Sequence, residues 1–423
     1  MVDDILNFAQ EADVKFIRLA FCDPFGVHKN ISIMPTELKD AFERGISFDA
    51  SSIRGFEEVS RSDLFLFPDA TTLTALPWRP EPGCVIKFFC DIKYADGSIY
   101  IGDSRNILRN VIKKISKMGY GARIGSESEF YLFKLDDYGE PTYTPIDNGT
   151  YFDVAPLDQG EDVRREICLV LSEMGLMPET SHHEQGPGQN EIDFKYSDAM
   201  TCADNLLAFK NVVKIISARH GLFASFMPKP LEGKSGSGLH INISLMKNGR
   251  NVFSKQHLEQ DVRDSFIAGI LARISEITLF LNSTVNSYDR LGAFEAPDYV
   301  SWSHQNRSAL IRIPAQGDTK TRIELRSPDG ASNPYIAFAL VLSAGIYGIE
   351  NNLKLEDENT KIEMLPQSLE EAISKAKNSL FVKEVLGEEF VAKYITIKEL
   401  ELQNYYDCED KKDFYTKEYF CKL

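Results

Sequence analysis

The chain has 423 residues, of which 43% are hydrophobic and 26% charged, a balance typical of a globular protein with a large core. Its formal net charge of -16 disfavours binding to nucleic acid or to an anionic membrane surface. The seven cysteines are scattered without a CxxC motif, and the N-terminus carries no apolar signal segment. We therefore expect a cytoplasmic protein with reduced thiols that binds neither nucleic acid nor membrane.

The first hundred residues alternate short apolar runs with turn signals such as Asp96-Gly97, which predicts a small strand-rich domain over residues 1–103. A second domain is expected over residues 104–423, opening with a helix that Ser104 can cap. Further helices are predicted at residues 164–174, 203–218, 266–281 and 334–349. The tail after Leu400 is rich in Tyr, Asp and Lys, and we expect a solvated terminal helix or extension.

Four short segments alternate polar and apolar residues, so their polar side chains should share one face of a strand. The polar positions are Glu127 and Glu129; Glu191 and Asp193; His240, Asn242 and Ser244; and Arg322, Glu324 and Arg326.

Polar faces on half-exposed strands in water are the simplest interpretation of this pattern. However, acids, one histidine and paired arginines occupy separate strands, and converging carboxylates are costly unless cations neutralise them. Carboxylates with a single imidazole suit Mg²⁺ or Mn²⁺, and arginines suit phosphate. This combination predicts a site with two metal ions for phosphoryl transfer, which Glu184 could join from a loop.

A glycine-rich segment at residues 229–238 contains Gly-Lys-Ser, but the P-loop pattern requires a glycine where Pro228 stands. The segment therefore predicts a turn leading into the His240 strand rather than a phosphate-binding loop.

With these motifs in order, the chain resembles glutamine synthetases of the bacterial and archaeal type I class along nearly its whole length. The motifs that carry the resemblance are Phe48-Asp49-Ala50-Ser51-Ser52-Ile53, the Glu127-Ser128-Glu129 strand, His182-His183-Glu184, Phe226-Met227-Pro228-Lys229-Pro230, Gly236-Ser237-Gly238-Leu239-His240, Asn286-Ser287-Tyr288, Glu295-Ala296-Pro297, Asn306-Arg307-Ser308 and Arg322-Ile323-Glu324-Leu325-Arg326.

The resemblance implies an α+β fold, with a small N-terminal β-grasp domain and a large catalytic domain whose curved antiparallel sheet forms a half-barrel flanked by helices. It implies a dodecamer of two hexameric rings with active sites between subunits. It also implies that glutamate, ATP and ammonium are converted to glutamine through a γ-glutamyl phosphate, with two or more Mg²⁺ or Mn²⁺ ions in each site.

The same resemblance implies a role for each matching residue. One metal would be held by Glu129, Glu184 and Glu191, and the other by Glu127, His240 and Glu324. Phosphoryl charge would be stabilised by Arg307, Arg312 and Arg322, and substrate carboxylates bound by Arg290, Arg326 and Gly236. Nucleotide contacts would come from Glu179, Phe194, Asn242, Ser244 and a neighbour's Phe56. The ammonium pocket would be formed by a neighbour's Asp49, with Ser52 and Tyr151, under a flap that carries Glu295.

Three of the departures from the family pattern bear on substrate binding. Ser235 replaces an asparagine that helps bind glutamate, Ala50 replaces a glycine, and the flap around Glu295 is one residue shorter than usual. These departures leave two alternatives to a glutamine synthetase: a γ-glutamyl ligase for another amine or acid, and a non-catalytic paralogue. The complete metal shell argues against the paralogue, and the retained Asp49, Ser52 and Tyr151 favour ammonium.

Overall fold

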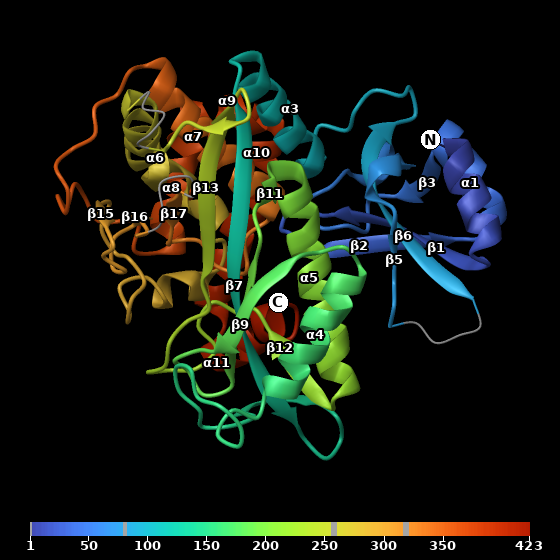
Figure 1. Ribbon diagram of the computed structural model, residues 1–423, viewed down its shortest axis with the longest axis horizontal. Coiled ribbons are helices and arrows are strands. Elements are labelled where there is room, and N and C mark those ends of the chain that lie inside the picture. The colour runs from blue at the N-terminus through green and yellow to red at the C-terminus, as the bar shows by residue number, and fades with distance from the viewer. Residues whose placement is uncertain (1, 79–82, 255–259, 316–320) are drawn as a thin grey trace.

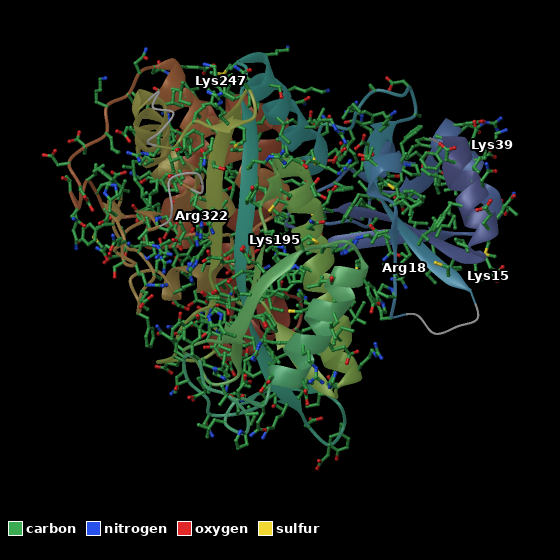
Figure 2. The ribbon with its side chains drawn as sticks, in the orientation of Figure 1. Lys15, Arg18, Lys39, Lys195, Lys247 and Arg322 are labelled. Atoms are coloured by element: carbon green, nitrogen blue, oxygen red, sulfur yellow. The ribbon has the colours of Figure 1, made fainter. Side chains whose placement is uncertain are left out.

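The computed structural model describes residues 2–78, 83–254, 260–315 and 321–423. Figure 1 shows two parts side by side: a small N-terminal part in blue, and a larger part in which long strands lie against helices. Lys15 and Lys39 lie on the outer side of the small part, away from the large sheet (Figure 2).

The N-terminal part is a six-stranded sheet with the order β2-β1-β6-β4-β3, to which β5 adds beside β6. β1 pairs with β6 in parallel and the other pairs are antiparallel. Its core is built from apolar strand residues, such as Leu19 and Phe88, that are fully buried. The elements are α1 (Val2–Glu11), β1 (Val14–Cys22), β2 (His28–Ile33), α2 (Leu38–Arg44), β3 (Ile46–Asp49), β4 (Asp63–Pro68), β5 (Thr74–Ala75) and β6 (Cys84–Tyr94).

The larger part is built on an eleven-stranded sheet with the main order β15-β16-β17-β13-β7-β10-β9. All of its pairs are antiparallel except β15 with β16. Its strands are β7 (Gly121–Leu135), β8 (Pro141–Pro145), β9 (Pro178–His183), β10 (Gln189–Phe194), β11 (Ser197–Asp198), β12 (Leu222–Ser225), β13 (Leu239–Lys247), β14 (Arg250–Asn251), β15 (Trp302–His304), β16 (Ile311–Ile313) and β17 (Ile323–Leu325).

Helices cover one side of this sheet, and α3 and α5 contact β7 directly. Each of the four helices predicted by periodicity is present, as α4 to α7. The helices α4, α5 and α6 begin several residues before the predicted start, and α7 begins at the predicted residue. The helices are α3 (Ser104–Lys117), α4 (Glu161–Glu173), α5 (Ala199–Arg219), α6 (Gln260–Leu281), α7 (Pro334–Glu350), α8 (Leu369–Asn378), α9 (Leu380–Leu386), α10 (Glu388–Asp407) and α11 (Lys411–Tyr415).

Two local predictions need correction. Asp103, not Ser104, caps α3, because its carboxylate accepts hydrogen bonds from the backbone N–H groups of Arg105 and Asn106. The C-terminal tail is not simply solvated: Tyr419 and Phe420 are buried. They join a separate aromatic cluster against β7, which offsets the cost of ordering the tail.

The two parts are joined by a buried guanidinium. Arg105 donates to Asp204 on α5 at 3.0 Å, and to Asp69 and Asp91 of the small part at 2.8 and 3.0 Å. Such a fork of charge-assisted hydrogen bonds fixes the orientation of the two parts. Among the helices that the structure describes, none is long and apolar enough to cross a membrane.

Candidate active site

The register of the large sheet brings the predicted acids together. On β7 and β10, Glu129 lies opposite Glu191, and on β7 and β13, Glu127 lies opposite His240. Because side chains of a strand alternate between faces, these four project from the same side. Glu324 on β17 lies opposite Asn242, two residues along from His240. The four alternating segments of the sequence therefore do converge, as predicted.

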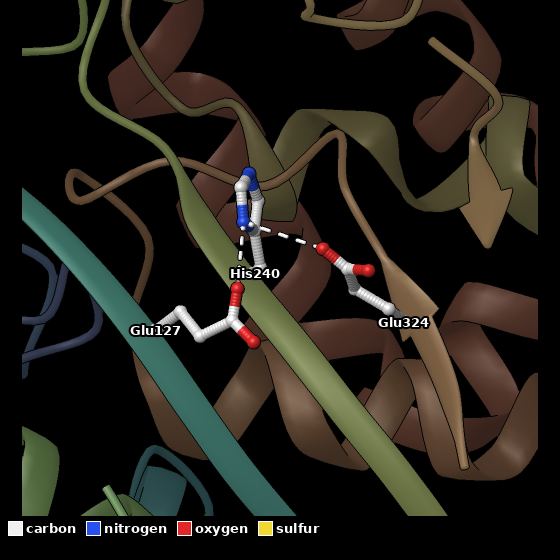
Figure 3. A group of neighbouring side chains, drawn as sticks. All are labelled: Glu127, His240 and Glu324. Atoms are coloured by element: carbon white, nitrogen blue, oxygen red, sulfur yellow. Dashed lines mark hydrogen bonds and ion pairs between the residues drawn. The ribbon is translucent and has the colours of Figure 1, made fainter. Parts of the chain in front are cut away.

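The first group is Glu127, His240 and Glu324, drawn in Figure 3. His240 Nδ1 lies 3.1 Å from a Glu127 oxygen and 3.5 Å from a Glu324 oxygen. One ligand atom from each residue lies within 4.8 Å of the others, close enough to bind one ion. Glu324 is fully buried, and it is ion-paired with Arg326 at 2.5 Å and with Arg312.

The acids behind this group fall into two overlapping sets. Glu129, Glu191 and His240 have ligand atoms within 4.8 Å of one another, and so do His182, Glu184 and Glu191. The expected set of Glu129, Glu184 and Glu191 is thus shared between two groups, with His182 beside Glu184 at 3.1 Å. A further group joins Asp193 to Glu127 and Glu191.

Opposing pKa shifts reflect the crowding of these carboxylates. Burial raises the pKa of Glu127, but hydrogen bonds from His240 and Asn242 outweigh it and lower that pKa to about 2. Burial, with repulsion from Asp193 and Glu129, raises the pKa of Glu191 well above its ordinary range. The cluster therefore contains like charges that an added cation would stabilise.

The donor set fits a hard divalent cation. Carboxylate oxygens and one imidazole nitrogen face each other at ion-binding separation, and this chemistry suits Mg²⁺ or Mn²⁺ better than a thiolate-seeking metal.

A pocket of about 440 Å³ opens over these groups. The predicted site residues that line it are Glu127, Glu129, Glu184, Glu191, His240, Tyr151, Gly236, Arg290, Glu295, Arg307 and Arg326.

Arg290 is fixed in the pocket wall by its own backbone partners. The residue is 4% exposed, and its guanidinium donates to the Ser327 and Arg326 carbonyl oxygens at 2.7 and 3.1 Å. A Cβ atom at Gly236 would come within 2.7 Å of the Arg290 side chain, and one at Gly238 within 2.6 Å of its guanidinium. The glycine-rich turn predicted from sequence is therefore required for this close approach.

The flap segment lies at the mouth of the pocket. Glu295 is half-exposed and one carboxylate oxygen lies 3.9 Å from Arg326. Phe294 has a φ of +56°, a conformation that costs a non-glycine residue energy, and Lys229 Nζ lies 4.9 Å from its ring. The left-handed backbone of Phe294 therefore lies immediately before Glu295, and both residues line the pocket.

Three predicted residues lie outside the pocket lining and contact the candidate metal ligands or one another. Asn242 donates to Glu127 at 2.8 Å and accepts from Arg322 at 2.6 Å. Arg322 is labelled beside the large sheet in Figure 2. Arg312 supports Glu324.

Other predicted residues lie outside the pocket lining. Ser244 is half-buried on β13, and Glu179 is exposed on β9. Phe194 packs edge-on against Phe209, with ring centroids 5.1 Å apart. Their proposed nucleotide contacts stay predictions.

The residues expected from a neighbouring subunit also lie outside this pocket. Asp49 and Ser52 are exposed on the small part, as such a role requires. Phe56 differs: the residue is 5% exposed, and its ring lies 5.3 Å from the Tyr100 ring in the N-terminal core. Its expected nucleotide contact stays a prediction.

Two features of the site were missed from sequence. Gln189 Nε2 donates to both Glu129 and the Gly236 carbonyl at 3.0 Å, which joins the sheet to the glycine-rich turn. Its position two residues before Glu191, on the same face of β10, was the available signal. Below the Glu184 loop, His183 contacts Asp147 at 3.1 Å and the Glu184 carbonyl at 2.6 Å. Adjacent His182 and His183 point apart, as predicted for an extended chain.

Comparison with known families agrees with this geometry. Residues 13–95 match the family described as glutamine synthetase, beta-Grasp domain, and residues 101–416 match glutamine synthetase, catalytic domain. A division of the chain at residue 103 stays a prediction.

Curated relatives match over almost the whole chain. The glutamine synthetase of Methanosarcina mazei is 47% identical, over 95% of this chain and 94% of its own length. That of Clostridium saccharobutylicum is 44% identical, over 95% of both chains, and a Staphylococcus aureus glutamine synthetase is 42% identical, over 99% and 98%.

Solved structures share the fold. One titled "GmaS/ADP complex-Conformation 1" superposes with a TM-score of 0.87 at 28% identity, over 98% of this chain and 99% of that one. Another, "Apo GmaS without ligand", superposes with the same TM-score at 29% identity, over 96% and 97%. The predicted α+β fold, with its β-grasp domain and half-barrel sheet, is confirmed. The chain belongs to the glutamine synthetase family and is a ligase.

Proposed function

We propose that the protein is an ATP- and metal-dependent glutamate–ammonia ligase that forms glutamine through a γ-glutamyl phosphate. The observation that carries the proposal is one pocket whose lining brings Glu127 and His240 together with Arg290 and the Glu295 flap. The buried Glu324 lies beside Glu127 and His240 at ion-binding separation. A divalent cation held there would neutralise phosphate charge and orient the transferring group.

The chemistry needs two successive displacements. A γ-carboxylate oxygen of glutamate attacks the terminal phosphorus of ATP, and ADP leaves. Ammonium would give a proton to the Asp49 carboxylate of a neighbouring subunit. The resulting ammonia would attack the acyl carbon, and inorganic phosphate would leave. Arg290 and Arg326 would bind substrate carboxylates, and Arg307 would stabilise charge on the transferring phosphoryl group.

An acyl phosphate must meet ammonia before water reaches it, so the pocket has to close. The 290–297 flap at the mouth is the segment suited to do this, and Glu295 would face the amine. In a two-ring dodecamer, the exposed Asp49 and Ser52 would complete a neighbour's ammonium pocket beside Tyr151. We place this assembly in the cytoplasm.

Phosphate release by the purified protein tests the proposal. We expect release to require ATP, glutamate, ammonium and Mg²⁺ or Mn²⁺ together, and chelation to stop it. Protein that stays inert to ammonium at saturating glutamate, with native secondary structure by circular dichroism, would rule the proposal out.

A second candidate is a γ-glutamyl ligase for another amine or acid. Ser235 favours it, because its hydroxyl hydrogen-bonds Gln185 at 3.2 Å within the pocket lining, where the family carries an amide. A screen of amines and acids with the same readout decides between the two. A substrate used with a higher kcat/KM than ammonium or glutamate would favour this second function.

A further inference from the structure

One buried carboxylate lies at the junction of three segments that are far apart in the sequence. Glu401 on α10 has a side chain that is 2% exposed. One of its oxygens accepts from Arg54 at 2.9 Å and from Lys398 at 2.9 Å, and the other accepts from the Tyr419 hydroxyl at 2.7 Å. Both carboxylate oxygens therefore have hydrogen-bond partners. A carboxylate bound in this way holds its partner segments in fixed positions.

The first arm leads to the segment that follows Asp49. Residues 50–57 form consecutive turns, with Ile53 N–H bonded to Ala50 and Phe56 N–H bonded to Ile53. Arg54 projects from this segment to Glu401, and its guanidinium lies 4.9 Å from the Phe25 ring.

A second polar contact holds the same segment against α10. Glu57 also bonds Lys393 of α10 at 3.0 Å. The segment that follows Asp49 and carries Ser52 is thus anchored to α10 rather than only to its own sheet.

The second arm leads to the flap. The Tyr419 hydroxyl that donates to Glu401 also accepts from the Val285 N–H at 3.1 Å. Val285 opens the 3-10 turn Val285–Asp289, which continues by backbone hydrogen bonds into Arg290 and Ala293. Arg290 and Glu295 line the pocket immediately afterwards.

We propose that Glu401 is a positioning residue that joins the Asp49 segment to the base of the Arg290–Glu295 flap. The inference rests on the proposed function, in which these two segments admit ammonium and close the site. If Asp49 serves a neighbouring subunit, the same carboxylate links the flap of one site to the ammonium pocket of the next. The C-terminal segment is then part of the catalytic architecture and not only a packing element.

Hydrogen–deuterium exchange tests whether Glu401 holds the two segments, without relying on turnover. Glu401→Gln keeps the shape but loses the charge that binds Arg54 and Lys398. We expect exchange to rise about tenfold, the scale of one lost charged hydrogen bond, in both residues 50–57 and residues 285–297.

Glu399→Gln is the matched control, because Glu399 lies two residues away on the same helix in a half-exposed pair with Lys377. It should change neither segment. Unchanged exchange in both segments of Glu401→Gln would overturn the proposal whether or not the protein makes glutamine.

Steady-state kinetics separates positioning from stability. We expect Glu401→Gln to raise the KM for ammonium by about fivefold to tenfold, a loss of one charged contact. Arg54→Met cuts only the first arm and Tyr419→Phe only the second, so adding either to Glu401→Gln should give less than the product of the single effects. Variants with a lower melting temperature but unchanged KM and kcat would mark Glu401 as merely structural. Failure of the proposed function would instead be seen in the unaltered protein.

Discussion

The pocket has two halves that are built differently. In the strand half, Glu127, Glu129, Glu191 and His240 occupy neighbouring ladder positions of β7, β10 and β13. In the loop half, residues such as Arg290 come from turns whose positions depend on individual polar contacts. The ladder fixes the direction of a side chain by alternation alone, whereas each loop needs its own buried anchors.

The difference implies different responses to mutation. A strand-half substitution leaves the ladder in place and removes only a ligand, so activity should fall while the fold persists. A loop-half substitution should alter stability or affinity. The substituted side chain also makes the hydrogen bonds that hold its loop in place, so both are lost together.

The largest effect is expected at the strand half. Glu324→Ala removes a fully buried carboxylate beside His240. Loss of outer contacts alone typically costs metal sites about 10- to 100-fold, so we expect a larger loss of turnover here. His240→Ala should behave alike, and each is measured by phosphate release with circular dichroism to check folding.

Glu166→Gln is the control for charge removal, because Glu166 pairs with Arg219 and His220 far from the pocket lining. Activity retained by Glu324→Ala would contradict the assignment of the strand half as the metal site.

This contrast also explains what could be predicted from sequence. Period-two alternation identified Glu127, Glu191, His240 and Glu324 without a structure, because a half-buried strand permits only one face for each. Helical periodicity located α4 to α7 for the same reason, with starts that shifted because caps are local.

The contacts of the loop half could not be predicted from residue periodicity. The anchor of Asp147 under His183 depends on a tertiary contact that no spacing encodes. Burial of Phe420 against Phe133 likewise depends on where β7 lies, and the polar composition of the tail concealed it.

The second prediction concerns the border between the halves. Gln189→Leu keeps the volume but removes the amide that bonds Glu129 and the Gly236 carbonyl. We expect kcat/KM to fall about 10- to 100-fold, as for other residues that orient metal ligands. Added Mg²⁺ or Mn²⁺ should recover part of the loss if Glu129 is only misoriented. A fall that is insensitive to metal concentration would show that the glycine-rich turn is the more affected partner.

The third prediction tests an anchor of the loop half through pH. Burial raises the pKa of Asp147, but hydrogen bonds from His183 and three backbone N–H groups outweigh it and lower that pKa to about 2. Because the folded pKa lies below the unfolded value, this stabilisation is complete above about pH 4 and disappears as the pH falls through 2.

Asp147→Asn should therefore lower the unfolding free energy by about 2 kcal/mol at pH 7, and by progressively less below pH 4. Urea unfolding at a series of pH values measures the difference. A constant difference from pH 7 to pH 3 would show that packing, not the carboxylate charge, stabilises the loop.

The smallest effect is expected at Ser235, in the loop half of the pocket lining. The Tyr131 hydroxyl donates to the Ser235 carbonyl at 2.7 Å, so the backbone is held and a substitution changes only the side chain. Ser235→Asn extends an amide donor into the pocket, and one added hydrogen bond should lower the KM for glutamate by about two- to tenfold. Ser235→Ala is the control, since it removes the hydroxyl contact with Gln185 without adding a donor. An unchanged KM for glutamate in Ser235→Asn, with tighter binding of another acid, would mean that the loop half has been adapted to a different substrate while the strand half has kept its chemistry.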